Sequence, residues 1–183
     1  SWLIHFRHTS EPHNAMFIQV IYPLLGQLSR LIAIPSIALF HAARVVASLF
    51  MYMSLYQLAA TIWPRRRSRR MFFIIAAIGS GMGWLFIILT GDLGGVPDLV
   101  IPEMFPFYSS LVNVHFPLTI ACLALMSSVF IVVFRPGSTD EPSLNNGGLL
   151  VGVASFGLSL LYPQALVPFG LASVGLVGLR VIR

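Results

Sequence analysis

Five apolar stretches, separated by short polar or proline-containing segments, make up most of this chain. About 20 apolar residues, at ~1.5 Å of helix each, are needed to cross the ~30 Å hydrocarbon core of a bilayer. The stretches cover residues 36–63, 71–89, 115–134, 147–162 and 165–179, the last two being the shortest. We therefore predict an all-α fold: a polytopic helical membrane protein with about five transmembrane helices, forming a single transmembrane domain over residues 1–183.

Composition excludes two other classes of protein. The chain is 57% hydrophobic and 9% charged, whereas a soluble domain carries about 25% charged residues. A single soluble domain could not bury so much apolar surface, and disordered chains are far less hydrophobic. Because there is one cysteine, Cys122, neither a disulfide framework nor a cysteine-based metal site is available. We predict no metal and no cofactor, and we expect bound lipid.

The basic residues are placed asymmetrically. Eleven basic residues, all arginine, stand against six acidic ones. Five of them form what we call the arginine cluster, between the first two apolar stretches: Arg65, Arg66, Arg67, Arg69 and Arg70. Arg135 follows the third stretch, and Arg180 and Arg183 follow the fifth. If the five spans alternate in direction, all eight arginines lie on one side of the membrane.

The positive-inside rule makes that side cytoplasmic. We therefore expect a multi-pass protein of the inner (plasma) membrane, with an extracytoplasmic N-terminus. The arginine cluster is then a contact for anionic lipid and not a nucleic-acid interface. The expected partners are membrane lipids and other integral membrane subunits.

Two further segments read as something other than spans or simple loops. Residues 1–35 are expected to be extracytoplasmic or interfacial, and within them residues 16–34 are apolar but interrupted by proline, glycine and arginine. This favours an interfacial or re-entrant helix, with a sixth crossing as the alternative. Residues 100–111, rich in proline and aromatics, are expected in the headgroup belt. Tyr162-Pro163-Gln164 predicts a tight turn between the last two spans.

Ionisable groups inside apolar spans are the first candidates for function, because burying them in a bilayer is costly. His41 and Arg44 lie three residues apart and so share one helix face near the predicted outer surface. Together with His115, they are candidates for binding a phosphate or carboxylate, since arginine holds an oxyanion with two hydrogen bonds. The alternative is that Arg44 pairs with a neighbouring carboxylate or reaches outward, with His41 packed beside it. His41 is also a weak candidate ligand for a pigment metal.

The predicted outer side collects the carboxylates that could act as a general base. Glu11 precedes the interrupted helix, and Asp98 and Glu103 lie in the loop that leads to His115. A carboxylate and a histidine facing one cavity can share acid–base work. The alternative is that these groups form a solvated loop surface.

Several short motifs, in chain order, resemble the C-type membrane glycosyltransferases, which are polytopic bacterial proteins. They are Glu11-Pro12-His13, Tyr22-Pro23-Leu24-Leu25-Gly26-Gln27-Leu28, Phe40-His41-Ala42-Ala43-Arg44, Ser80-Gly81-Met82-Gly83-Trp84, Pro102-Glu103, Asn113-Val114-His115-Phe116 and Leu161-Tyr162-Pro163. The resemblance implies an extracytoplasmic cavity that takes sugar from a lipid-phosphate donor, with a catalytic carboxylate in the first outer loop, for which Glu11 is the candidate. Family members are much longer than this chain.

Two hypotheses follow. The favoured one is an integral membrane accessory or scaffold subunit of a larger complex, respiratory or photosynthetic for example, that is not itself catalytic. The alternative is a core fragment of a lipid-phosphate-sugar-dependent glycosyltransferase. In that case Arg44 and His41 hold the donor phosphate, and Glu11, Asp98 or Glu103 supplies the base.

Overall fold

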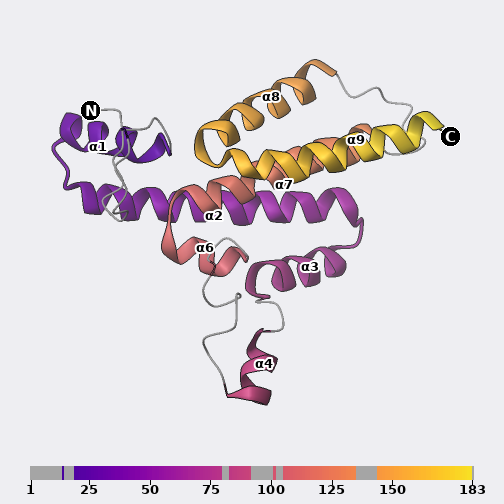
Figure 1. Cartoon of the computed structure of the whole chain (residues 1–183), viewed down its shortest axis with the longest axis horizontal. Helices are drawn as coiled ribbons and strands as arrows, with labels where there is room; N and C mark the ends of the chain where they lie inside the picture. Colours follow the sequence, from indigo (N-terminus) through magenta and orange to yellow (C-terminus); the bar gives the residue numbers. More distant parts are fainter. Residues whose placement is uncertain are drawn as a thin grey trace.

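The computed structural model describes residue 14 and residues 19–79, 83–91, 101, 105–134 and 144–182. Within these residues the chain is all-α, which confirms the predicted class (Figure 1). The helices are α1 (Ile21–Ile32), α2 (Ser36–Ile62), α3 (Arg66–Ile78), α4 (Gly83–Thr90), α6 (Pro106–Val112), α7 (His115–Val133), α8 (Leu144–Leu161) and α9 (Leu166–Ile182). A 3₁₀ turn, Pro163–Ala165, stands between α8 and α9.

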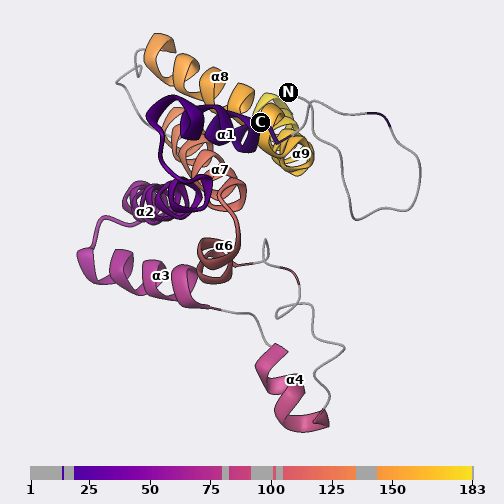
Figure 2. The ribbon, with the colours of Figure 1, turned by 90° about the vertical axis from the view of Figure 1, so that its left-hand side faces the viewer.

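The centre of the bundle is the contact between α2 and α7, which lie side by side over most of their lengths (Figures 1 and 2). Met51 and Leu55 of α2 pack against Ala121 and Ala124 of α7, and all four side chains are buried. The two alanines are small enough to let large side chains of the neighbouring helix fill the space between the axes.

The two central helices run in the same direction. Near the start of α2, Arg44 contacts Leu111, which lies just before α7. At the far end of α2, Thr61 shares a groove with Val132, close to the end of α7. Because the two helices are parallel, the chain between them has to return along the bundle, and α3 begins that return.

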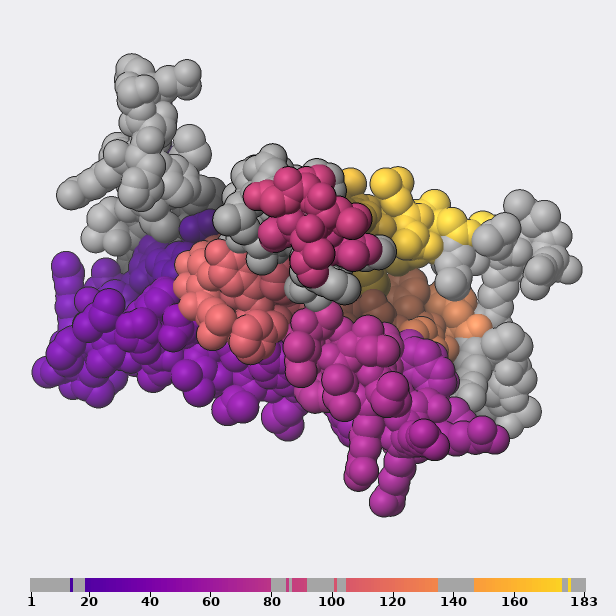
Figure 3. All heavy atoms as spheres, turned by 90° about the horizontal axis from the view of Figure 1, so that it is seen from below, coloured from indigo at the N-terminus to yellow at the C-terminus, as the bar shows by residue number. Residues whose placement is uncertain are grey.

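α3 lies along α2 on the outer face of the bundle (Figure 3). Phe73 places its ring between Tyr52 and Tyr56 of α2, with centroid distances of 6.1 and 5.9 Å and edge-on geometry. Edge-to-face contacts of this kind are a favourable arrangement for aromatic rings. These contacts hold α3 against α2 after the chain reverses direction at Trp63.

α8 packs antiparallel to α7 on the side away from α3. Its first part lies beside the end of α7, where a Cβ at Gly147 would stand 3.4 Å from the side chain of Val129. At its other end the Tyr162 ring lies 6.1 Å from the ring of Phe116, near the start of α7. Leu158 is fully buried in this contact. The predicted turn at Tyr162-Pro163 is present, and α9 runs back from it (Figure 1).

α1 covers the end of the bundle where α2 begins (Figure 2). It ends at Ala33, whose positive φ of 54° reverses the chain direction. Pro35 then precedes the first residue of α2, a position where the fixed φ of proline suits a helix start. The helix predicted within residues 16–34 is therefore present over Ile21–Ile32.

Of the about five predicted transmembrane helices, the structure supports two by length and composition. Within the described residues, two helices are long and apolar enough to cross a bilayer: Ser36–Ile62 and His115–Val133. Their boundaries match the first and third predicted stretches to within one residue at each end. The apolar part of α8, Gly147–Leu161, is shorter than a span, and α9 has 17 residues.

The second predicted stretch fails because it is not one helix. The helix α3 contains arginines of the cluster in its first turns and ends at Ile78. The next helix, α4, begins at Gly83. Gly79 adopts an extended conformation, and a Cβ there would stand 2.3 Å from the carbonyl oxygen of Ile75. Glycine therefore permits this break, and residues 71–89 contain two short helices in place of one span.

Candidate functional site

A histidine and a tyrosine from distant parts of the chain meet where α1 covers the bundle. The Tyr22 hydroxyl of α1 lies 2.6 Å from Nδ1 of His115, the first residue of α7. His115 is buried, with 4% of its surface exposed. When the imidazole carries its proton on Nε2, the Tyr22 hydroxyl donates to Nδ1. This bond ties α1 to α7 across 93 positions of sequence.

The environment of the Tyr22 phenol favours its neutral form. Burial raises the pKa of Tyr22, and hydrogen bonds with the backbone of Val114 and His115 oppose this only in part. These backbone groups belong to the first turn of α7, where N–H groups have no partner within the helix.

Aromatic rings enclose the imidazole. Phe116 lies beside His115 with a centroid distance of 4.1 Å, and the Tyr162 ring, at the end of α8, lies 6.4 Å away. On the α2 side, Phe40 stacks on Tyr22 at 6.3 Å. Side chains of α1, α2, α7 and the α8–α9 turn thus converge on one polar group.

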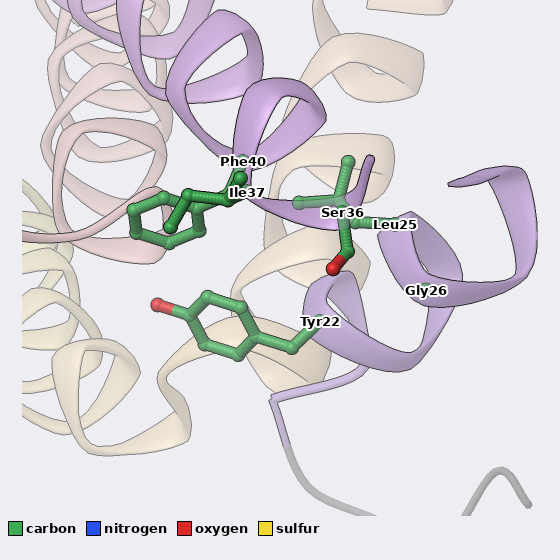
Figure 4. A pocket seen from close by; sticks show the side chains of 6 residues that line it. All are labelled: Tyr22, Leu25, Gly26, Ser36, Ile37 and Phe40. Atoms are coloured by element: carbon green, nitrogen blue, oxygen red, sulfur yellow. The ribbon is translucent and has the colours of Figure 1, made fainter. Parts of the chain in front are cut away.

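A small groove opens next to this pair, between α1 and α2, and holds about 280 Å³. Figure 4 shows the Tyr22 ring beside Phe40, with the hydroxyl pointing away from α1 residues Leu25 and Gly26. Ser36 adds a hydroxyl to a lining that is otherwise apolar or aromatic. The groove suits an apolar group better than a charged one.

Arg44 is used to hold α6 against α2. Its guanidinium donates to the carbonyl of Leu111, at the C-terminal end of α6. One turn later, Ser48 donates to the carbonyls of Arg44 and Ser110, at 2.7 and 3.3 Å. Tyr52 donates to the Ser110 hydroxyl at 3.4 Å. A cation at a helix C-terminus also complements the negative end of the helix dipole.

The three predicted anion-binding residues therefore occupy different settings. His41 is exposed and contacts Phe40 edge-on at 5.5 Å. Arg44 is half-buried and donates to a carbonyl of α6. His115 is buried and is hydrogen-bonded to Tyr22. All three lie at the same end of the bundle, but His115 is paired with a residue that no sequence signal connects to it. Glu11, Asp98 and Glu103 lie outside the described residues.

At the opposite end, the arginine cluster begins α3. Arg69 donates from Nε to the carbonyl of Trp63 at 2.6 Å and so closes the end of α2. The other four members of the cluster are exposed. Trp63 stacks at a tilt on Phe72, with a centroid distance of 4.8 Å. Arginine and aromatic side chains therefore share this end of the molecule.

Among the described residues, no three His, Cys, Asp or Glu side chains come close enough together to hold a metal ion. All six acidic residues of the chain lie outside the described ranges. The Tyr22–His115 pair can share a proton, but within the described part no carboxylate stands beside it. No family model, curated protein or solved structure matches the chain. The resemblance to C-type glycosyltransferases stays a prediction.

Proposed function

We propose that this chain is an integral membrane helical subunit that acts as a scaffold in a larger membrane complex. The observation that carries the proposal is the exposure of large apolar side chains along the helices. On α2 they include Val46 at 66% and Met53 at 71%, and on α8 and α9 Phe156 at 67% and Val174 at 72%. Soluble monomers rarely expose contiguous apolar surface of this extent.

The two long apolar helices differ from the core helix of a soluble protein. Such a core helix is mostly buried, whereas only 28% of the most apolar window of α2 and 33% of that of α7 are buried. Their hydroxyl side chains are also turned inward on the helix backbone. Ser54 donates to the carbonyl of Phe50, and Ser128 donates to that of Ala124, each at 2.8 Å. Such bonds satisfy hydroxyls where water is absent.

Charge placement agrees with a membrane orientation. The parallel arrangement of α2 and α7 puts the arginine cluster and the end of α7 at one end of the bundle, and the Tyr22–His115 pair at the other. If α2 and α7 both cross, the residues between them must return through the bilayer, with α3 as part of that return. The arginine end is then cytoplasmic and α1 is extracytoplasmic.

In the scaffold role, the α8–α9 hairpin would contact the partner subunits. Gly148 and Gly152 lie four residues apart on α8, and a Cβ at either position would meet nothing within 4 Å. On α9, a Cβ at Gly170 or Gly175, which lie five residues apart, would likewise meet nothing within 4 Å. Small residues four positions apart, as on α8, let membrane helices approach closely, and the described part of the chain leaves these faces uncovered. They suit the helices of a partner subunit.

The polar end of the bundle also fits a structural role. Within the described residues, every buried side-chain nitrogen or oxygen has a hydrogen-bond partner. A polar network that satisfies itself rigidifies a fold. A preformed ligand site, by contrast, keeps polar atoms for the ligand.

A lipid-phosphate glycosyltransferase core is the second candidate. It is favoured by the presence of His41, Arg44 and His115 at one end of the bundle, because Arg44 has further N–H donors beyond the one bound to Leu111. Under this candidate Arg44→Ala abolishes sugar transfer from a lipid-phosphate donor. Transfer that persists in this variant, and in alanine variants of Glu11, Asp98 and Glu103, would contradict it.

The scaffold proposal is tested by native purification. Membranes are washed with alkaline carbonate, extracted in mild detergent, and the particle is analysed by intact mass. We expect the 20.1 kDa chain to resist the wash and to elute within a larger particle of several different subunits. Release by carbonate would contradict membrane integration, and a stable monomer with no co-purifying subunit would contradict the scaffold role.

A further inference from the structure

A surface groove of about 410 Å³ runs along α3 at the arginine end of the bundle. Its lining changes character along the helix. Arg67 and Ser68 stand at the start of α3, and Met71, Phe72 and Ile75 follow on the same face at intervals of three, four or five residues. Trp63, at the end of α2, forms the opposite wall. The groove is thus polar and cationic at one end and apolar at the other.

We propose that this groove binds one anionic phospholipid, with the phosphate on Arg67 and Ser68 and an acyl chain along Met71, Phe72 and Ile75. The inference rests on the proposed membrane location and names a specific ligand within it. In that location the start of α3 lies at the cytoplasmic headgroup level, and its apolar part points into the bilayer. Tryptophan at the membrane interface, as Trp63 would be, is a common feature of such proteins.

Charge complementarity selects an anionic lipid over a zwitterionic one. Arg65, Arg66, Arg67 and Arg70, at the start of α3, are all exposed. The sequence from Trp63 to Thr90 contains no Asp or Glu that could neutralise them. Arg69 is already bound to the Trp63 carbonyl, so it anchors the wall and does not compete for the phosphate. Arginine recognises a phosphate through two parallel hydrogen bonds, and the Ser68 hydroxyl can add a third.

The apolar end of the groove has exposed side chains that an apolar ligand would bury. Met71 is 55% exposed and Ile75 is 64% exposed, although both line the groove. Trp63 and Phe72 hold their rings together at 4.8 Å and so keep the far wall in place without a ligand. An acyl chain lying along this surface would be in contact with α3 and with the Trp63 ring at once.

Trp63 supplies the test. In a Trp2→Phe, Trp84→Phe background it is the only tryptophan, and the full chain is reconstituted in vesicles of phosphatidylcholine with a fixed fraction of phosphatidylglycerol. Quenching of Trp63 is compared when either lipid carries bromine on its acyl chains. We expect brominated phosphatidylglycerol to quench more strongly. Arg67→Gln should lower this preference about fivefold, because it removes a direct charge-assisted hydrogen bond to the lipid phosphate.

Arg66→Gln is the matched control, because Arg66 is exposed on the same helix and does not line the groove. It removes the same charge and should lower the preference less than about twofold, since screened charges act weakly at a distance. Arg67→Lys keeps the charge and replaces Arg67→Gln in the test if that variant does not fold. We expect it to retain part of the preference.

The outcomes separate the two proposals. Equal quenching by both lipids, or an equal loss in the Arg66 and Arg67 variants, would overturn the lipid site and leave the membrane location intact. No quenching by either brominated lipid would overturn the membrane location, and the lipid site with it.

Discussion

The Tyr22 hydroxyl and Nδ1 of His115 lie 2.6 Å apart, which joins a helix near one end of the chain to the first turn of α7. Because His115 is buried, the imidazole has few alternatives to this partner. Phe40 of α2 stacks on the Tyr22 ring, so the contact also involves α2. The contact explains why an isolated 12-residue helix with no buried side chain of its own holds a fixed place.

Tyr22→Phe removes the hydroxyl and keeps the ring. We expect the free energy of unfolding in detergent to fall by about 1–3 kcal/mol, the cost of leaving a buried polar group without its partner. Tyr56→Phe is the control, since Tyr56 is exposed and contributes a ring contact with Phe73. Equal stability of the two variants would show that the Tyr22–His115 bond does not hold α1.

The raised pKa of Tyr22 predicts a loss of stability in alkaline solution. An unfolded tyrosine ionises at about pH 10, whereas burial keeps Tyr22 protonated to higher pH in the folded state. The unfolded state therefore releases its proton first, and stability falls as pH rises above 10. Unfolding measured from pH 8 to pH 11 should show a smaller decline for Tyr22→Phe than for the original chain. Parallel declines would contradict the shift.

Arg44→Met keeps the apolar stem of the side chain and removes the bond to the Leu111 carbonyl. A hydrogen bond to a charged group is worth about 1.5–3 kcal/mol, so α6 should open more often. Hydrogen exchange of the amides in residues 107–112 should rise, while exchange in the centre of α7 should not. Arg30→Met, on the exposed side of α1, should leave both unchanged. Unaltered exchange in α6 would show that Arg44 is not its anchor.

Gly152→Leu places a bulky side chain on the open face of α8. Because a Cβ at that position would meet no described atom outside its own helix backbone within 4 Å, helix content and thermal stability in detergent should not change. Co-purification of partner subunits should be lost, since close helix packing requires small residues. Val153→Leu adds bulk at the neighbouring exposed position and should retain the partners. Retention by both variants would exclude this face as the interface.

The sequence predicts the two central helices well. Pro35 and Trp63 bracket α2, and the apolar stretch from His115 coincides with α7, because long apolar stretches leave the backbone no other way to satisfy its hydrogen bonds in lipid. The turn at Pro163 and the helix after residue 20 were also predictable, since proline and glycine mark breaks that depend on local chemistry.

The second stretch and the candidate site depend on information that is not local. A hydropathy profile cannot predict that the helix ends at Gly79. The glycine there adopts an extended conformation that a residue with a Cβ could not adopt without a clash. Arg44 was expected to bind an anion, to pair with a neighbouring carboxylate or to reach outward, and its partner is a backbone carbonyl 67 residues away. The sequence could not predict that Tyr22 contacts His115. Only the parallel packing of α2 and α7 brings α1 to the start of α7.

The membrane location is tested most directly by the reactivity of single cysteines. Met53 is 71% exposed in the middle of α2, and Ser36 is exposed at its start, so the chain itself shields neither. In a Cys122→Ala background, Met53→Cys and Ser36→Cys are treated with a water-soluble maleimide in native membranes. We predict labelling of the cysteine at 36 and little labelling at 53, with both labelled after denaturation in detergent. Equal labelling of the two positions in intact membranes would contradict a helix that crosses the bilayer.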